Sequence, residues 1–332
     1  MLQALSRIGR RRALRVGAVL VVVLGLLLWW LLPLGKPAPS GTLTFSTGVR
    51  SGVYQRYGER LMGDLARDLP QVSIRLRTSE GSQQNIARVA TGKADFTIAT
   101  ADALATYLHD RGPGADRLRG CVRLYDDYIQ LVVPRGSPVR QVSDLRGLRI
   151  GVGQPGSGVR LVADRVMEAA GLDPNDDVTP VPDGIDTMPR QLETGRLDAF
   201  FWSGGLPTSA VQELSDRFAV RLVPMEASLV KELQAVGGAA RHYRSAVMPA
   251  DAYRNAQQGQ AVPTLAIANV LVTTDRTDPS MTAAFTRTVI DSRDRIGREV
   301  HAAQLVDLRT AIYTDPLPLH EGAKRYYRSV KP

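Results

Sequence analysis

A glycine-rich segment, Gly151–Gly158, carries the clearest binding chemistry, because it lies between a short apolar run and a stretch with helical spacing. Glycines in such a loop take positive φ values without steric cost and leave backbone N–H groups accessible. N–H groups at the start of a helix, together with the positive end of the helix dipole, attract an anion. Ser157 could add a hydroxyl donor there. The segment therefore predicts a site for a small anion or polar ligand.

Two other interpretations of this loop stay open at this point. The spacing Gly151-Val-Gly153-Gln-Pro-Gly156 fits the G-x-G-x-x-G pattern of dinucleotide-binding loops, and Asp183 could be the acid that binds the ribose. The same glycines could also form a tight turn with no ligand. Because the pattern is local and weakly specific, the location of the chain and its other loops must decide between these interpretations.

Side chains that commonly perform covalent or metal chemistry are few and scattered. Cys121 is the only cysteine in the sequence, so no internal disulfide can form, and its apolar surroundings favour a core position. The four histidines lack the spacing of metal ligands: His109, His242, His301 and His320. No serine or cysteine triad is visible. We therefore expect a binding protein with no catalytic residues, no metal and no cofactor.

The N-terminal region has the composition of a membrane segment. Five arginines precede Val16–Leu34, nineteen residues without a charge that include Trp29 and Trp30. A basic flank, an apolar span and interfacial aromatics are typical of a transmembrane helix with its N-terminus in the cytoplasm. The length favours an uncleaved anchor, although Ala38-Pro-Ser40 could be a cleavage site. We expect residues 1–40 to form a basic stub, anchor and linker of a single-pass cell-membrane protein whose C-terminal domain is extracytoplasmic.

The formal net charge of +9 does not indicate nucleic-acid binding. Six basic residues, five arginines and Lys36, lie before residue 40 with no acid among them, and subtracting them leaves +3 for the rest of the chain. Charges of both signs alternate along that remainder, which is typical of solvated surfaces. We expect no nucleic-acid partner.

The elements that must position the binding loops alternate between strands and helices. Expected strands lie at Leu43–Ser46, Val72–Leu76 and Ala94–Ala99, each followed by a helical stretch. This alternation predicts parallel strands, and in such sheets the loops at the carboxyl ends of the strands line the ligand site. Three polar loops should meet at that edge: Thr47–Gly52, Ser79–Asn85 and Thr100–Asp102.

The alternation begins again after a break at Pro134–Pro138. Two apolar runs, Leu124–Val133 and Val262–Thr273, are long enough to cross between two lobes. We therefore expect lobe I at residues 41–134 plus 264–332 and lobe II at residues 135–263. Two α/β lobes joined by strands form a cleft that closes around a ligand by hinge motion.

Short motifs follow one another in a fixed order along the chain: Thr47-Gly48 to Gly52 and Tyr54, Gly81-Ser-Gln-Gln-Asn85, Gly92-Lys-Ala-Asp95, Pro155-Gly-Ser-Gly158, Gly195-Arg-Leu-Asp-Ala-Phe-Phe201, Gly205-Leu-Pro207, Val262-Pro-Thr264 and Pro318-Leu-His320 to Tyr327. In this order they resemble the TAXI-type solute-binding proteins of tripartite (TRAP) transporters, a branch of the type II periplasmic-binding-protein fold. The resemblance covers about residues 41–330. The sequence differs from the family pattern at Arg50-Ser51, at Thr100-Ala101 and in its membrane anchor.

The resemblance implies a two-lobed α/β periplasmic-binding-protein-like (type II) fold, here with an N-terminal transmembrane helix. It also implies extracytoplasmic capture of a small anionic metabolite, such as a dicarboxylate, a 2-oxo acid or an amino acid like glutamate. The expected protein partner is a TRAP membrane permease subunit. The alternative is a membrane-tethered ligand sensor that performs no transport, which an uncleaved anchor would favour.

Candidate ligand-binding residues lie on or beside the loops of both lobes: Thr47, Gly48, Arg50, Tyr54, Ser82, Asn85, Asp102, Gly156, Ser157, Gly158, Trp202 and Gly205. Arg50 could hold a carboxylate through two parallel hydrogen bonds, or it could point to solvent. Ser82 and Asn85 could donate to a carboxylate, but Ser82, like Asp102, could also cap a helix. Tyr54 and Trp202 could form walls of the site or fill the core.

Overall fold

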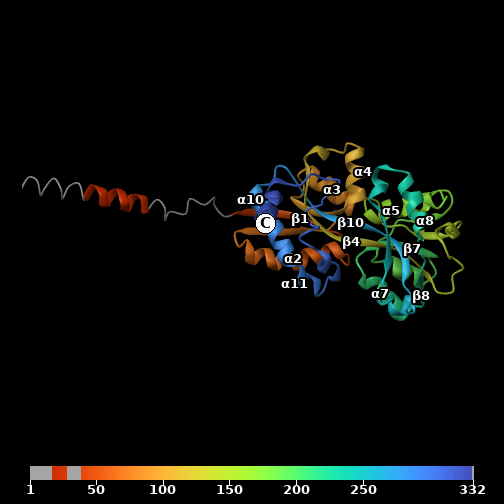
Figure 1. Ribbon diagram of the computed structural model, residues 1–332. Helices are drawn as coiled ribbons and strands as arrows, with labels where there is room; N and C mark the ends of the chain where they lie inside the picture. The colour runs from red at the N-terminus through yellow and green to blue at the C-terminus, as the bar shows by residue number, and fades with distance from the viewer. Residues whose placement is uncertain (1–16, 28–38, 331–332) are drawn as a thin grey trace, which may run out of the picture. The chain divides into compact units, whose positions relative to one another are not determined.

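The computed structural model describes residues 17–27 and 39–330, which belong to two units, Met1–Ala38 and Pro39–Pro332 (Figure 1). In the first unit, residues 17–27 form a helix. The remainder of the expected anchor Val16–Leu34 lies outside the described residues. Within the described residues, no helix has the length and apolar character needed to cross a membrane. The anchor therefore stays a prediction.

From Pro39 onward, the strands of the described chain form one ten-stranded sheet with two halves. In the first half, β1 (Gly41–Ser46) lies parallel to β2 (Val72–Arg77) and to β3 (Phe96–Thr100). The predicted parallel arrangement of these three strands is confirmed. The order then continues through β10 (Val262–Thr274) and β4 (Leu118–Pro134), which are antiparallel to their neighbours.

The second half is built around β5 (Arg149–Gly151), which lies parallel to β6 (Thr179–Val181) and to β7 (Ala199–Gly204). Two further strands join through antiparallel pairs, β8 (Val220–Leu222) with β4 and β9 (Arg244–Met248) with β10. The sequence pattern did not predict β9, because four of its five residues are partly or fully exposed and no apolar alternation marks it.

Strands β4 and β10 connect the two halves. β4 pairs with β10 over residues 118–128 and with β7 and β8 over residues 128–134. β10 pairs with β9 over residues 262–266 and with β3 over residues 269–272. Each long strand therefore passes from one lobe into the other, as predicted from the two apolar runs. We call the part around β1–β3 lobe I and the part around β5–β7 lobe II.

The helices cover both lobes (Figure 1). Lobe I contains α2 (Val53–Asp68), α3 (Ser82–Ala90), α4 (Ala101–His109), α10 (Pro279–Asp291), α11 (Arg293–Gly297) and α12 (Glu321–Val330), with short 3-10 helices at Ala115–Arg117 and His301–Leu305. Lobe II contains α5 (Gly158–Ala169), α6 (Met188–Glu193), α7 (Ser209–Arg217), α8 (Ala227–Ala235) and α9 (Arg254–Gln257), with 3-10 helices at Val142–Leu145 and Gly238–His242.

Separate hydrophobic clusters stabilise the lobes. One cluster lies mainly in lobe II and includes Ala101 of α4. Two clusters lie in lobe I, where neighbouring strand residues alternate between them: Leu271 belongs to one cluster and Val270 to the other. This alternation follows from the two-residue period of a strand, so the sheet of lobe I is covered on both faces. Phe96 and Phe285 stack with their ring centroids 4.2 Å apart. Cys121 is fully buried in this core, as predicted.

Candidate functional site

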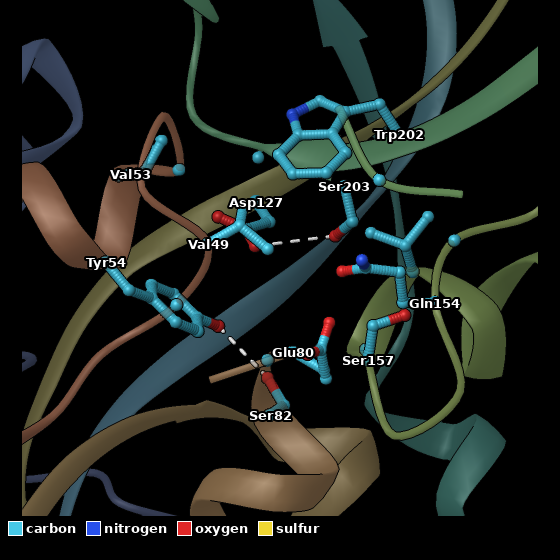
Figure 2. A pocket seen from close by; sticks show the side chains of 18 of the residues that line it. Val49, Val53, Tyr54, Glu80, Ser82, Asp127, Gln154, Ser157, Trp202 and Ser203 are labelled. Carbon is cyan, nitrogen blue, oxygen red and sulfur yellow. Dashed lines mark hydrogen bonds between the residues drawn. The ribbon is translucent and has the colours of Figure 1, made fainter. Parts of the chain in front are cut away.

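A cavity of about 60 Å³ lies between the lobes, and we call it the interlobe pocket (Figure 2). Lobe I contributes the loop before α2 and the start of α3, while lobe II contributes the loop between β5 and α5 and the end of β7. Its walls combine small, apolar and polar residues: Gly48, Val49, Gly52, Val53, Tyr54, Glu80, Gly81, Ser82, Thr100, Asp127, Gly153, Gln154, Ser157, Gly158, Val159, Gly184, Trp202, Ser203 and Gly204.

Half of the predicted ligand-binding residues lie on this wall. From lobe I these are Gly48, Tyr54 and Ser82, and from lobe II they are Ser157, Gly158 and Trp202. They are far apart in the sequence and meet because their loops occupy the facing edges of the two lobes. Whether they contact a ligand stays a prediction.

Tyr54 and Ser82 form a hydrogen-bonded wall on the lobe I side (Figure 2). The Tyr54 hydroxyl lies 3.1 Å from Ser82 Oγ and donates to Asn269 Oδ1. Burial raises the pKa of Tyr54 well above its ordinary value, and the charge of Asp127 adds to the rise, so the hydroxyl stays protonated. Ser82 is not the helix cap that the sequence allowed. Gly81 occupies the cap position of α3, and Ser82 Oγ accepts from Thr100 N at 3.2 Å.

Ser157 lies directly before α5, on the lobe II side of the pocket. Its Oγ accepts a hydrogen bond from Arg160 N at 3.0 Å, so it caps the helix in the usual way. Its backbone carbonyl accepts from Gln83 Nε2 of lobe I at 2.8 Å. Next to it, the carbonyl of Gly156 accepts from Gln84 N at 3.1 Å. The loop between β5 and α5 is therefore bonded directly to the start of α3 in the other lobe.

Glycines make this close approach possible. A Cβ atom on Gly81 would lie 3.2 Å from Ser157 Cα, and one on Gly158 would lie 3.2 Å from Ser82 Oγ. At these distances the facing residue of the other lobe would have to shift by a few tenths of an ångström. Gly81 also has φ +132°, a conformation that side-chain-bearing residues rarely adopt. The two lobes are consequently in contact across the pocket.

Four predicted residues of lobe I lie outside the pocket, and Thr47, Arg50 and Asn85 are three of them. Arg50 is exposed on the turn Val49–Gly52, which a hydrogen bond from Gly52 N to Val49 O closes at 2.9 Å; the turn directs its flanking residues inward and Arg50 outward. Thr47 and Asn85 are buried beneath the wall, where Asn85 Nδ2 donates to Thr47 O at 2.6 Å and to Ile98 O at 3.1 Å. These two residues hold strands and loops together.

Asp102 and Gly205 also lie outside the pocket, at other contacts between the lobes. Asp102 is 1% exposed, does not cap α4, and pairs with Arg165 of α5 at 3.2 Å. It also accepts from the Tyr243 hydroxyl. A Cβ atom on Gly205 would lie 2.7 Å from Ala302 Cβ of lobe I, so this glycine permits close packing. Gly156, described above, is likewise absent from the wall of the pocket.

Sequence reasoning missed Asp127, which extends from β4 into the pocket (Figure 2). It is 4% exposed, and its Oδ2 accepts from Ser203 Oγ at 3.4 Å. Within the described residues its Oδ1 has no hydrogen-bond partner. Burial raises the pKa of Asp127 to about 7. The available signal was the pair Asp126-Asp127, which interrupts the apolar run Leu124–Val133.

The neighbouring carboxylate differs from Asp127 in its partners. Asp126 pairs with Arg123 at 2.6 Å and with Arg244, so its charge is compensated. Glu80, also missed, is the other acid on the wall of the pocket. None of the described wall residues is Lys, Arg or His. The described wall of the pocket therefore carries two acidic side chains and no basic one, and whether the glycine loop binds an anion stays a prediction.

Two α/β lobes that share two crossing strands and enclose a pocket define the class of two-lobed binding folds. The NMT1-like family matches residues 45–330, and the chain belongs to this family. Within the described residues, no group of three or more His, Cys, Asp or Glu side chains is placed to hold a metal ion.

Solved structures share the fold at low sequence identity. A protein from Listeria monocytogenes named for an L-cystine ABC transporter is 14% identical, with 80% of this chain and 98% of that chain covered and a TM-score of 0.50. A protein from Bordetella bronchiseptica RB50 is 17% identical, with coverages of 90% and 92% and a TM-score of 0.51. The alkanesulfonate-binding protein of Xanthomonas axonopodis pv. citri is 17% identical, with coverages of 90% and 86% and a TM-score of 0.47. The predicted two-lobed periplasmic-binding-protein-like fold is confirmed.

Proposed function

We propose that this chain is an extracytoplasmic solute-binding protein that closes its two lobes around a small organic solute and delivers it to a membrane transporter. The observation that carries the proposal is the interlobe pocket, whose walls come from both lobes while hydrogen bonds join the lobes beside it. Closure of a cleft around a ligand is the usual motion of such folds. The name of the Listeria protein also supports a role in transport. We propose that the protein binds its solute without catalysing a reaction.

The transporter type is a further part of the proposal. The order of sequence motifs supports a TRAP membrane permease subunit as the partner and a TAXI-type identity for this chain. The Listeria protein is instead named for an ABC transporter. Co-expression of the full chain with a permease of each type, followed by uptake assays of a bound solute, distinguishes the two. Uptake with the ABC permease alone would contradict the TRAP assignment.

We also propose, from the sequence, that Val16–Leu34 anchors the protein in the cell membrane and that the lobes extend over residues 41–134 plus 264–332 and residues 135–263. The basic flank and apolar length of the segment support the anchor. Alkaline extraction of membranes that contain the full chain tests this directly. A protein released into the soluble fraction would contradict an uncleaved anchor.

Thermal unfolding in the presence of candidate solutes tests the function itself. A ligand at a hundred times its dissociation constant stabilises the folded state by about 2.7 kcal/mol. For lobes of this size the melting temperature should then rise by roughly 5–10 °C. The panel should contain amino acids, amines, organic acids and sulfonates. The variant Arg50→Ala, which changes an exposed residue beside the pocket, should respond like the wild type. The absence of any shift across the panel would contradict the proposal.

A further inference from the structure

The charge of the interlobe pocket restricts the chemistry of its solute. Asp127 and Glu80 place two carboxyl groups on the described wall, and none of the residues that line the pocket is basic. An anionic solute would meet like charge in a partly desolvated cavity, where electrostatic repulsion is stronger than in water. A dicarboxylate or a 2-oxo acid is therefore a poor fit. A solute with a positively charged group fits the pocket better.

Asp127 offers the specific point of attachment. A buried carboxylate is costly unless hydrogen bonds or an opposite charge compensate it. One oxygen of Asp127 accepts only the 3.4 Å bond from Ser203, and the other has no partner within the described residues. The Asn269 amide lies close enough to favour the charged form of Asp127, yet its Nδ2 also lacks a hydrogen-bond partner. A protonated amino group would supply the missing donors.

Beside Glu80, the pocket also offers hydrogen-bond donors to a negative group of the same solute. The starts of α3 and α5 meet there, and both helices have enough turns to present N–H groups and a positive dipole end. Thr100 is 3% exposed, and within the described chain its Oγ1 has no partner. This hydroxyl lies beside Gly158, since a Cβ atom there would be 3.5 Å from it. A carboxylate could accept from these donors.

The size of the cavity favours a small molecule. A buried water needs at least about 10–15 Å³ of such space, so a cavity of about 60 Å³ holds roughly four to six of them. Trp202 and Val53 supply apolar surface for a short side chain (Figure 2).

We propose that Asp127 determines specificity by binding the protonated amino group of a small amino acid, so that the pocket prefers an amino acid to the 2-oxo acid of the same shape. This inference rests on the proposed function. Of the solutes expected from the sequence, namely a dicarboxylate, a 2-oxo acid or an amino acid, it selects the amino acid.

Calorimetric titration of the full chain with matched pairs of solutes tests the inference. The pairs are alanine and pyruvate, 2-aminobutyrate and 2-oxobutyrate, and glutamate and 2-oxoglutarate, which differ in whether an amino group is present. We expect at least tenfold tighter binding of the amino acid in at least one pair. Asp127→Asn should reduce that preference at least tenfold, whereas Asp176→Asn, which changes an exposed aspartate, should leave it intact.

The outcomes separate this inference from the proposed function. Equal or tighter binding of the 2-oxo acids would overturn the role of Asp127 but leave solute binding in place. The role of Asp127 also fails, while solute binding stands, if neither member of any pair binds but a sulfonate raises the melting temperature. If no solute of any class binds, both proposals fail. Because the wild-type comparison needs no variant, it stays decisive even if Asp127→Asn folds poorly.

Discussion

At the residue scale, the buried carboxyl of Asp127 should make the stability of the empty protein depend on pH. Burial raises its pKa from 3.8 to about 7. Between about pH 4 and pH 7 the folded state therefore holds more protons than the unfolded chain, so the free energy of unfolding falls as pH rises. Asp127→Asn should remove this loss and stabilise the protein by up to about 4 kcal/mol at pH 8. Calorimetric melting from pH 4.5 to 8 measures the effect.

Other titratable groups surround Asp127 and must be separated from it. Asp126 and Asp102 add negative charge, and Tyr54 and Tyr125 are buried nearby with pKa values raised well above their ordinary range. The tyrosines therefore stay neutral throughout the measurement. Asp176→Asn should reproduce the wild-type profile. An Asp127→Asn protein with an unchanged profile would show that this carboxyl does not titrate as a buried group.

Arg50 and Asp127 show that the sequence predicts which loops lie near the site but not which side chains enter it. Loops at strand ends were identifiable, so Gly48, Tyr54 and Ser157 could be predicted near the pocket. The direction of a side chain within a tight turn could not be predicted, and Arg50 is exposed and lies outside the pocket wall. Asp127 lies within a crossing strand, and only the twist and alternation of that strand bring its carboxyl to the cavity.

At the element scale, the start of α3 should control how closely the lobes can approach. Gly81→Ala places a Cβ atom against Ser157 of the other lobe. We expect solute affinity to fall at least tenfold, because the closed arrangement binds the solute and the new methyl group opposes closure. Titration of the variant with its best solute measures this loss.

Gly92→Ala is a matched control for the same helix. Gly92 follows α3, also has a positive φ, and has nothing within 4 Å of its missing Cβ. It should suffer backbone strain without any effect on the contact between the lobes. If Gly81→Ala and Gly92→Ala lost the same affinity, backbone strain alone would explain the loss in Gly81→Ala.

Elements were predictable where their pattern is local. The sequence pattern predicts helices over Val53–Asp68 and Ala227–Ala235, and α2 and α8 have these bounds. The sequence pattern predicts one helix over Pro279–Ile296, but the structure interrupts it at Ser292. The Ser292 hydroxyl accepts no capping hydrogen bond from the second helix and donates to Thr288 O at 2.5 Å. Such a break depends on local backbone hydrogen bonding that competes with helix continuation, which the apolar pattern does not record.

At the scale of the whole molecule, the pair Asp102–Arg165 should favour the arrangement in which the lobes touch. Arg165→Met removes the charge that compensates a buried carboxylate, a loss of about 3–5 kcal/mol in typical buried pairs. Because the pair joins α4 to α5, the cost falls on the closed arrangement. We expect weaker solute binding and a larger radius of gyration in X-ray scattering.

Arg146→Met provides the comparison for this pair. Arg146 pairs with Asp177 within lobe II, and its side chain is 60% exposed. Exposed pairs contribute about 0–1 kcal/mol, so both the radius and the affinity should stay near wild-type values. Unchanged affinity in Arg165→Met itself would show that the interlobe pair does not influence closure.

The two-lobed organisation was predictable because two apolar runs were too long for ordinary strands and lay at the ends of the second α/β repeat. The contacts between the lobes were not predictable. They join Gln83 and Gln84 to a loop more than 70 positions away, and no local pattern marks such pairs. The charge of the pocket likewise emerges only when both lobes are in place.

Closure of the lobes on a solute is the central claim, and the distance between them tests it most directly. Lys93→Cys on lobe I and Glu232→Cys on lobe II place fluorophores at two exposed positions, while the native Cys121 is buried and should stay unlabelled. Energy transfer between the fluorophores should rise when the amino acid with the largest thermal shift is added, because the lobes approach each other. Unchanged energy transfer at saturating solute would contradict the account.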